Sequence, residues 1–141
     1  MSGPPEPIGL YQPFARSGSL VAVSAISPTR GGEGMTGKVG ATLSFEQGRE
    51  AARRAAENLL AVLVDAAGGD PAAVEQILLV RGHVNSVESY PDVHKVIDAA
   101  SELLIERLGD RGRHARTAIG CAALPNDNAV TLEALAIVSP R

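Results

Sequence analysis

The sequence predicts an α+β fold, a two-layer sandwich of two helices on one face of a mixed β-sheet. Strand-like and helix-like runs alternate along the 141 residues, and each helical run carries a single apolar stripe. The length suits one domain with its own hydrophobic core. We therefore expect a single domain over residues 1–141, in which the proline- and glycine-rich residues 1–9 form a loose N-terminal arm.

The first strand is predicted at residues 19–26, SLVAVSAI. This run is short, apolar and rich in β-branched residues, and Ser27–Pro28 closes it. An extra strand around Phe14 and Arg16 is left open. Residues 29–40 hold five glycines without periodicity, so we expect a loop there.

The clearest element is a helix that begins after Ser44. Ser44 and Gln47 have the spacing of a capping box, in which each side chain satisfies a backbone donor of the first turn. Glu50 and Arg54 are spaced for an i,i+4 ion pair, and Gly68–Gly69 ends the helix. The apolar face is rich in alanine, which predicts close packing against a sheet; it comprises Ala52, Ala55, Ala56, Leu59, Leu60, Leu63 and Val64.

A second strand and a second helix follow. Residues 74–85 are apolar first and then alternate with polar residues, which is typical of a strand that leaves a covered sheet towards solvent. Pro91 suits the first turn of a helix. Apolar residues then recur with helical period as far as Gly109, which predicts the second helix.

Two β-type runs, residues 114–124 and 129–138, complete the chain. Residues 125–128 between them have the composition of a turn, and we expect this turn to join the two runs as paired strands. The strands are apolar on both sides, whereas the predicted helices cover one face. A second copy of the chain is one way to cover the other face.

Composition counts against several classes of function. Lys and Arg number 13 against 16 Asp and Glu, and aromatic residues make up 3%, so nucleic acid is not expected as a partner. The sequence has no apolar run of bilayer length and no signal peptide, so no membrane partner is expected either. The single Cys121 favours a reducing, cytoplasmic setting.

No motif for a cofactor or a metal is present. Residues 31–34 lack the Lys-Ser/Thr ending of a phosphate-binding loop. His83, His94 and His114 fall in different predicted elements and share no short metal-binding spacing. We therefore expect neither a cofactor nor a metal, and each histidine is interpreted as a surface or loop residue.

Arg116 stands at the start of an otherwise small and apolar strand. A guanidinium is costly to bury unless an anion meets it. Two interpretations are open. Arg116 forms a structural ion pair with a carboxylate of this chain, or its planar fork binds a substrate carboxylate in a bidentate manner.

Several sequence features occur here in an order that is typical of one family. They are Tyr11, the strand ending SAISP, the segment TGKVG before the capped helix, AAGGD after it, and the block GRHARTAIGCAALPNDNAVTLEALAIV. Through their order and spacing, the chain from Ile8 to Val138 resembles the reactive intermediate deaminase family, also called RidA or YjgF.

This resemblance implies a chorismate-mutase-like subunit that forms a homotrimer, with ligand clefts between neighbouring subunits. Similar members hydrolyse reactive enamines and imines, which pyridoxal-phosphate-dependent dehydratases make from serine or threonine, to 2-oxo acids and ammonia. The resemblance implies that Arg116 binds the carboxylate of a 2-imino or 2-oxo acid. It also implies that Tyr11, Ser24 and Ala25 line the pocket.

The sequence departs from the family pattern in the expected pocket. Ala118 replaces the usual cysteine, Ala25 replaces a glycine, and Thr131 replaces the glutamate that orients water in active deaminases. Glu133 lies on the same strand face as Thr131; it compensates for the lost carboxylate or is a structural residue bound to backbone or to an arginine. His114 is a general base beside the cleft or an exposed loop residue.

The resemblance therefore predicts an imine or enamine deaminase with Arg116, Thr131 and Glu133 as catalytic candidates. The pocket candidates are Tyr11, Ser24, Ala25 and Ala118. Because of Thr131, two alternatives stay open, namely a trimeric carboxylate-binding module without turnover and a diverged enzyme for another imine-like intermediate. Ribonuclease activity, which has been attached to some relatives, is not expected from the acidic balance.

Overall fold

The structure is a computed structural model that describes residues 3–7 and 9–140. Residues 1, 2 and 8 of the predicted arm lie outside the described residues. The elements are, in chain order, β1 (Phe14–Ser17), β2 (Leu20–Ile26), α1 (Phe45–Ala66), β3 (Val74–Asn85), α2 (Val93–Leu108), β4 (Ala115–Cys121) and β5 (Val130–Val138). The extra strand left open around Phe14 is present as β1.

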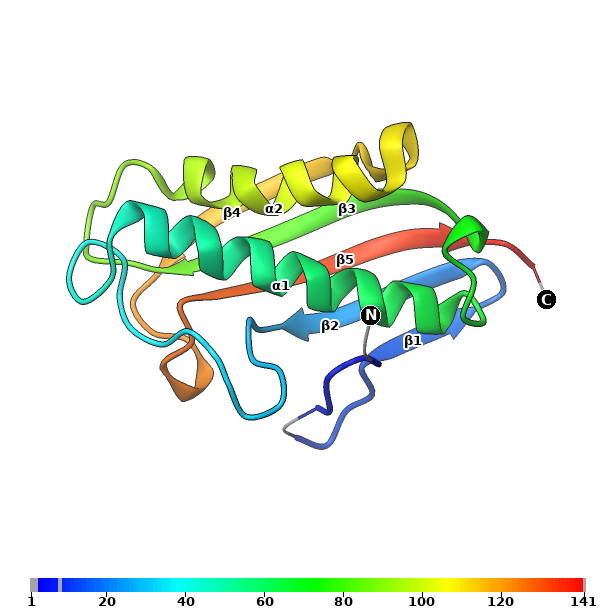
Figure 1. Cartoon of the computed structure of the whole chain (residues 1–141), viewed down its shortest axis with the longest axis horizontal. Coiled ribbons are helices and arrows are strands. Elements are labelled where there is room, and N and C mark those ends of the chain that lie inside the picture. Colours follow the sequence, from blue (N-terminus) through cyan, green and yellow to red (C-terminus); the bar gives the residue numbers. More distant parts are fainter. Residues whose placement is uncertain (1–2, 8, 141) are drawn as a thin grey trace.

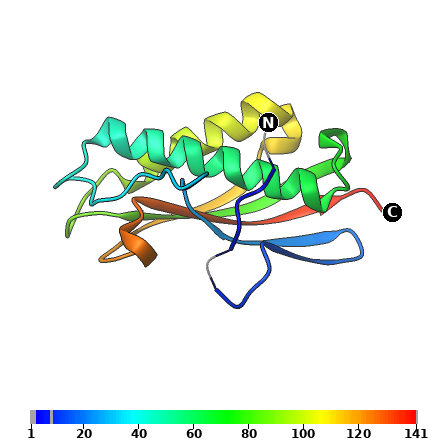
Figure 2. The same cartoon turned by 60° about the horizontal axis from the view of Figure 1, so that its bottom comes forward.

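The two helices lie side by side on one face of the sheet, and the other face is open (Figures 1 and 2). The predicted two-layer α+β sandwich is confirmed. Pairing of β3 with β4 is parallel and all other pairs are antiparallel, so the sheet is mixed.

The strand order is β1-β2-β5-β3-β4. The expectation that residues 114–124 and 129–138 form a hairpin is wrong, because β5 pairs with β2 and β3 while β4 pairs with β3 on its other side. The unit β3–α2–β4 is a crossover connection between parallel strands, and it places β4 at the sheet edge. Asn126 and Asp127, both at φ 56°, then turn the chain past the end of β3.

Helix α1 has the predicted ends. The Ser44 hydroxyl accepts a hydrogen bond from the Gln47 amide at 3.1 Å, and the Gln47 side chain accepts one from the Ser44 amide at 2.8 Å. Gly68 and Gly69 follow the helix with φ of 84° and 94°, a conformation that glycine adopts without strain. Local sequence therefore fixes where the helix begins and ends.

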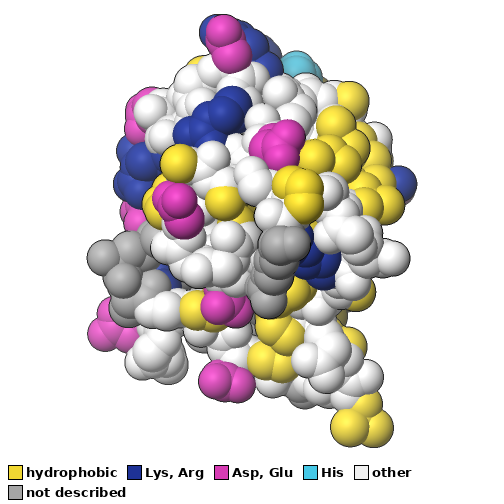
Figure 3. Space-filling view, turned by 90° about the vertical axis from the view of Figure 1, so that its right-hand side faces the viewer, with side chains coloured by type: hydrophobic (Ala, Val, Ile, Leu, Met, Phe, Trp, Pro, Cys, Tyr) yellow, Lys and Arg dark blue, Asp and Glu magenta, His cyan; other side chains and the backbone are white. Residues whose placement is uncertain are grey.

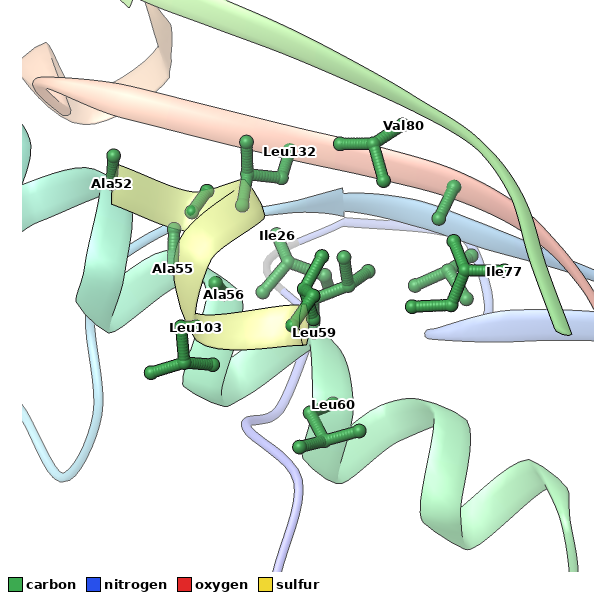
Figure 4. Close-up of a cluster of buried hydrophobic side chains, with 14 of the residues drawn as sticks. Ile26, Ala52, Ala55, Ala56, Leu59, Leu60, Ile77, Val80, Leu103 and Leu132 are labelled. Atoms are coloured by element: carbon green, nitrogen blue, oxygen red, sulfur yellow. The ribbon is translucent and has the colours of Figure 1, made fainter. Parts of the chain in front are cut away.

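The core lies between the helices and the sheet (Figure 4). The alanine-rich face of α1, with Ala52, Ala55 and Ala56, packs towards Leu132 of β5. On the α2 side, Gly82 of β3 has no side chain, and a Cβ there would lie 2.7 Å from the Ile97 side chain. Small residues thus set the close approach of both helices to the sheet.

The open face of the sheet carries large apolar side chains. Leu20, Leu78 and Ile119, from three strands, are each more than 40% exposed. Figure 3 shows hydrophobic side chains gathered along the right-hand side of that view. Among the described residues, no helix has both the length and the apolar character needed to cross a membrane.

Candidate functional site

A β-bulge near the end of β2 shapes the candidate site. Val23 pairs with Ala134 and Ile26 with Leu132, so β2 fits three residue steps against two on β5. Val23 and Ile26 are buried, whereas the intervening Ser24 and Ala25 turn away from the core. A bulge that re-aims side chains is common beside functional sites.

A cavity of about 920 Å³ lies beside this bulge. Its lining comes from the N-terminal arm, the end of β2, the glycine-rich loop after β2, the turn before β5 and the start of β5. Four of the predicted site residues belong to it: Tyr11, Ser24, Ala25 and Thr131. The structure therefore brings together residues that lie up to 120 positions apart in the sequence.

The hydroxyl groups of the lining are oriented by their neighbours. Ser24 Oγ donates to the Gln12 carbonyl at 2.6 Å, which leaves its lone pairs to accept from a ligand or a water molecule. Thr131 is buried, and its Oγ1 lies 3.5 Å from Nδ1 of His83, its register partner on β3. His83 was interpreted as a surface or loop residue. The register of β3 against β5 places it directly opposite Thr131 on the neighbouring strand.

Arg30 gives the cavity a positive charge that the sequence analysis missed. Its Nη1 donates to Asn58 Oδ1 at 3.2 Å, and its Nη2 donates to the Gly3 carbonyl of the arm. Asn58 is only 2% exposed although it lies on the apolar side of α1. In the sequence, the contact between Arg30 and Asn58 could have been suspected only from the polar Asn58 next to the apolar stripe of α1.

Arg116 lies outside the cavity lining. It extends from β4 towards α2, where Nη1 donates to Asp98 Oδ1 at 2.7 Å and to Ser101 Oγ at 3.2 Å, and Nη2 donates to the His94 carbonyl at 3.2 Å. Of the two interpretations of Arg116, the structure forms the ion pair with a carboxylate of the chain. Binding of a ligand carboxylate by Arg116 at a cleft between subunits stays a prediction.

Two other candidates also lie away from the cavity lining. Ala118 follows Arg116 by two positions, so strand alternation places it on the helix side, where it packs against the core. Glu133 pairs with Arg81, opposite it on β3, with Oε1 3.4 Å from Nη1. This contact with an arginine agrees with the structural alternative for Glu133.

His114 is neither in the cavity nor an exposed loop residue. It is half-buried beside Arg116, with Nδ1 2.6 Å from the Gly112 carbonyl and Nε2 2.9 Å from Ser101 Oγ. Burial lowers the pKa of His114 from its ordinary 6.5, the Gly112 hydrogen bond opposes this, and the Arg116 charge lowers it further. A neutral ring that donates from Nδ1 leaves Nε2 to accept from Ser101.

A smaller cavity near Cys121 is organised by Lys38. Its Nζ donates to Asn85 Oδ1 at 2.7 Å and to the Ala122 carbonyl at 2.6 Å, and it lies 3.4 Å from the Ser86 carbonyl. These contacts tie the loop before α1 to the ends of β3 and β4. Within residues 3–7 and 9–140, no three His, Cys, Asp or Glu side chains gather as metal ligands.

The fold and the site define a two-layer α+β subunit whose ligand cavity lies where the N-terminal arm meets a bulged strand. Residues 5–137 match the family described as "YjgF/chorismate_mutase-like, putative endoribonuclease". The chain therefore belongs to this family.

Individual relatives agree with this assignment. The protein TCP17 of Trypanosoma cruzi is 36% identical over 127 residues, which cover 89% of this chain and 79% of TCP17. The crystal structure of Atu1372 from Agrobacterium tumefaciens superposes with a TM-score of 0.88 at 36% identity, covering 91% of this chain and 82% of Atu1372. A Shewanella oneidensis protein described as a "putative endoribonuclease" has a TM-score of 0.91 at 28% identity, with 97% and 91% of the two chains covered.

Proposed function

We propose that the protein hydrolyses small 2-imino acids to 2-oxo acids and ammonia in the cavity beside the β2 bulge. The observation that carries this proposal is the meeting of Tyr11, Ser24 and Thr131 around one cavity. Three separate segments supply them, and each falls where the resemblance to the deaminase family implies a pocket residue. Membership of the family does not by itself specify a reaction.

The residues of the cavity suit a reaction that needs positioning more than activation. Water adds to the imine carbon, the C–N bond of the resulting tetrahedral carbinolamine breaks, and the nitrogen leaves as ammonia. Ser24 Oγ has lone pairs available for the water or the imine N–H, because its own proton goes to the Gln12 carbonyl. Holding both reactants in one geometry removes most of the entropic barrier.

The proton of the attacking water needs an acceptor, and Thr131 alone is a poor one. His83 lies behind it, with the two side chains 3.5 Å apart. Imidazole is the commonest general base in enzymes, and catalytic hydrogen bonds often tighten only when substrate is bound. The Thr131 hydroxyl therefore relays the proton from the water to His83, and the same path returns that proton to the nitrogen before ammonia leaves.

The second candidate function is binding of a carboxylate metabolite without turnover. It is favoured by Thr131 itself, since a hydroxyl stands where the resemblance implies a carboxylate. A diverged enzyme for another imine-like intermediate rests on the same substitution. Ligand-induced stabilisation by 2-oxo acids without product formation distinguishes binding from catalysis.

The expected homotrimer is part of this proposal. Copies of the chain that pack their open faces together cover Leu20, Leu78 and Ile119, which one subunit leaves exposed. Sedimentation of the wild type is expected to give three times the subunit mass. The variant Leu78→Glu is expected to sediment as a smaller species, and a monomeric wild type contradicts the assembly.

The test of the activity generates the imine in place. A dehydratase acts on serine or threonine, semicarbazide traps the imine that survives, and 2-oxo acid production is compared with and without the protein. We expect acceleration by the wild type and by Arg53→Gln, a control on the exposed face of α1. Thr131→Val and His83→Gln are expected to lower kcat about 10- to 100-fold. If the wild type produces 2-oxo acid no faster than buffer but still binds 2-oxo acids, the deaminase proposal is contradicted and the binding module remains.

RNA is not the substrate under this proposal. The net charge of −3 gives no attraction for a phosphate backbone, although relatives carry endoribonuclease in their descriptions. Purified protein is expected to leave structured and single-stranded RNA intact. Cleavage that persists through purification and is lost in Thr131→Val overturns the choice of substrate.

A further inference from the structure

We propose that Ser101 and His114 form a nucleophile–base pair that cleaves carboxylic esters through an acyl-serine intermediate. Ser101 lies on α2 and His114 lies directly before β4. Oγ of Ser101 and Nε2 of His114 are 2.9 Å apart. Neither residue lines the cavity beside the β2 bulge, so this activity is independent of the proposed imine hydrolysis.

The chemistry of the neighbouring groups fixes the direction of the hydrogen bonds around Ser101. A guanidinium can only donate, so Ser101 Oγ accepts from Nη1 of Arg116 at 3.2 Å. The Gly112 carbonyl can only accept, so Nδ1 of His114, at 2.6 Å from it, carries a ring proton. In the neutral ring Nε2 is then the acceptor, and the Ser101 hydroxyl donates to it. A hydroxyl aimed at an imidazole that a third group orients is the arrangement of an activated nucleophile.

The His114 ring must be neutral in order to take up the proton of Ser101. Burial lowers the pKa of His114 from its ordinary 6.5, the hydrogen bond to the Gly112 carbonyl opposes this, and the charge of Arg116 lowers the pKa further. The ring is therefore neutral at neutral pH, where it can act as a general base.

The guanidinium of Arg116 places a positive charge next to the nucleophile. Its contact with Ser101 Oγ stabilises the alkoxide that forms as the proton leaves. Asp98 Oδ1, at 2.7 Å, and the His94 carbonyl, at 3.2 Å, hold the guanidinium in place. Among the residues that the structure describes, Nε and one N–H of Nη2 have no acceptor, so they can donate to the oxyanion of a tetrahedral intermediate.

The pair can be reached from solvent between α2 and β4. The side chain of Asp98 is 47% exposed and that of Arg116 is 21% exposed, and Ser101 and His114 are both partly exposed. Arg116 extends from β4 towards α2, so the group lies on the helix side of the sheet. Packing of subunits through the open face of the sheet takes place on the opposite side.

The reaction proceeds in two balanced steps. Ser101 Oγ attacks the carbonyl carbon of the ester while its proton passes to Nε2 of His114. The tetrahedral intermediate collapses, the bond to the alkoxy oxygen breaks, and Nε2 gives the proton to the leaving alcohol. Water, deprotonated by the same nitrogen, then attacks the acyl carbon, and Ser101 leaves with that proton as the carboxylic acid is released.

The first experiment treats the full-length protein with an excess of a fluorophosphonate, which reacts with activated serines, and maps the adduct by mass spectrometry of peptides. We expect the adduct on Ser101. The variant His114→Gln keeps an acceptor for the hydroxyl but cannot take up its proton, so labelling is expected to be about 100-fold slower. Ser17→Ala, an exposed serine on β1, and Arg53→Gln, on α1, are the controls and are expected to label like the wild type.

The second experiment follows p-nitrophenolate release from p-nitrophenyl acetate. We expect a burst that is stoichiometric with the wild type and with Ser17→Ala and is lost in Ser101→Ala. Thermal unfolding establishes that each variant is folded, and the adduct map of the wild type requires no variant. No adduct at excess probe, an adduct confined to another residue, or equal labelling rates in wild type and folded His114→Gln overturns the proposal.

Discussion

Arg30 and Arg116 lie in two different regions of the molecule, and different kinds of partner hold their guanidinium groups. At the edge of the sheet, Arg116 meets the carboxylate of Asp98 across the gap between β4 and α2. At the cavity, Arg30 is oriented by the amide of Asn58, which adds no negative charge of its own. The guanidinium of Arg116 is thus tied to α2 through an ion pair, whereas that of Arg30 is tied to α1 through a buried neutral amide.

The largest expected effect concerns the amide at the centre of this comparison. Asn58→Leu removes one acceptor and two donors from a site that is 2% exposed, which leaves the Ser27 and Thr29 carbonyls without their partner. We expect the free energy of unfolding to fall by about 2–4 kcal/mol in denaturant titrations. Arg54→Leu, on the exposed side of α1, is the control and is expected to change it by about 0.5 kcal/mol or less. Equal stability of Asn58→Leu and wild type contradicts the structural role.

The next effect separates the two arginines directly. Arg116→Gln and Asp98→Asn are each expected to cost about 1 kcal/mol of stability, because the Asp98 side chain is 47% exposed and water screens the pair. A double-mutant cycle by thermal unfolding measures the coupling between the two side chains. Pyruvate affinity is expected to be unchanged in both variants. A tenfold loss of pyruvate affinity in Arg116→Gln would contradict this and would place the ligand at Arg116, at the edge of the sheet.

A smaller effect depends on pH and tests the burial of His114 beside Arg116. Its pKa is lowered in the folded state, so the unfolded chain binds more protons once the pH falls below the ordinary value of 6.5. Stability contributed by the neutral ring is therefore present above that value and is lost as the pH falls through the folded pKa. We expect wild-type stability to fall more steeply than that of His114→Gln between about pH 7 and pH 5. Parallel curves contradict the lowered pKa.

The smallest effect is expected on the open face of the sheet. Arg81 and Glu133 are 50% and 34% exposed, and their closest atoms are 3.4 Å apart. In the Leu78→Glu background, in which the open faces are expected not to pack together, Glu133→Gln is expected to cost about 0.5 kcal/mol or less, and the difference should vanish in about 1 M salt. Imine hydrolysis should be unaffected, since Glu133 does not belong to the cavity lining. A large drop in kcat would show that the Glu133 carboxylate takes part in the reaction.

Secondary structure was predictable from the sequence because its signals are local. The capping box at Ser44 and the alanine-rich stripe determine α1 without reference to any other element. Strand pairing is not local, and the turn composition at 125–128 is equally compatible with a hairpin and with the connection that the chain makes past β3. The predicted pairing of the last two strands was wrong for that reason.

The candidate site was predictable in part. Tyr11, Ser24 and Thr131 line one cavity, and their role there stays a prediction. Which way Arg116 points depends on the face of β4 that α2 covers. Strand β4 is small and apolar on both sides, so its sequence does not indicate that face. Arg30 lies in a loop without periodicity. Its place in the cavity depends on a contact with Asn58 of α1, which lies 28 residues further along the chain.

The position of β5 in the sheet has a consequence for biosynthesis. This C-terminal strand lies between β2 and β3, so the hairpin of β1 and β2 and the crossover unit of β3 and β4 share no strand pairing until it arrives. A nascent chain that has not yet left the ribosome therefore exposes two unpaired strand edges, which are sites for aggregation. Val138 must therefore have left the ribosome before the sheet can close, and truncation before Val130 is expected to yield unfolded chains that chaperones and proteases bind.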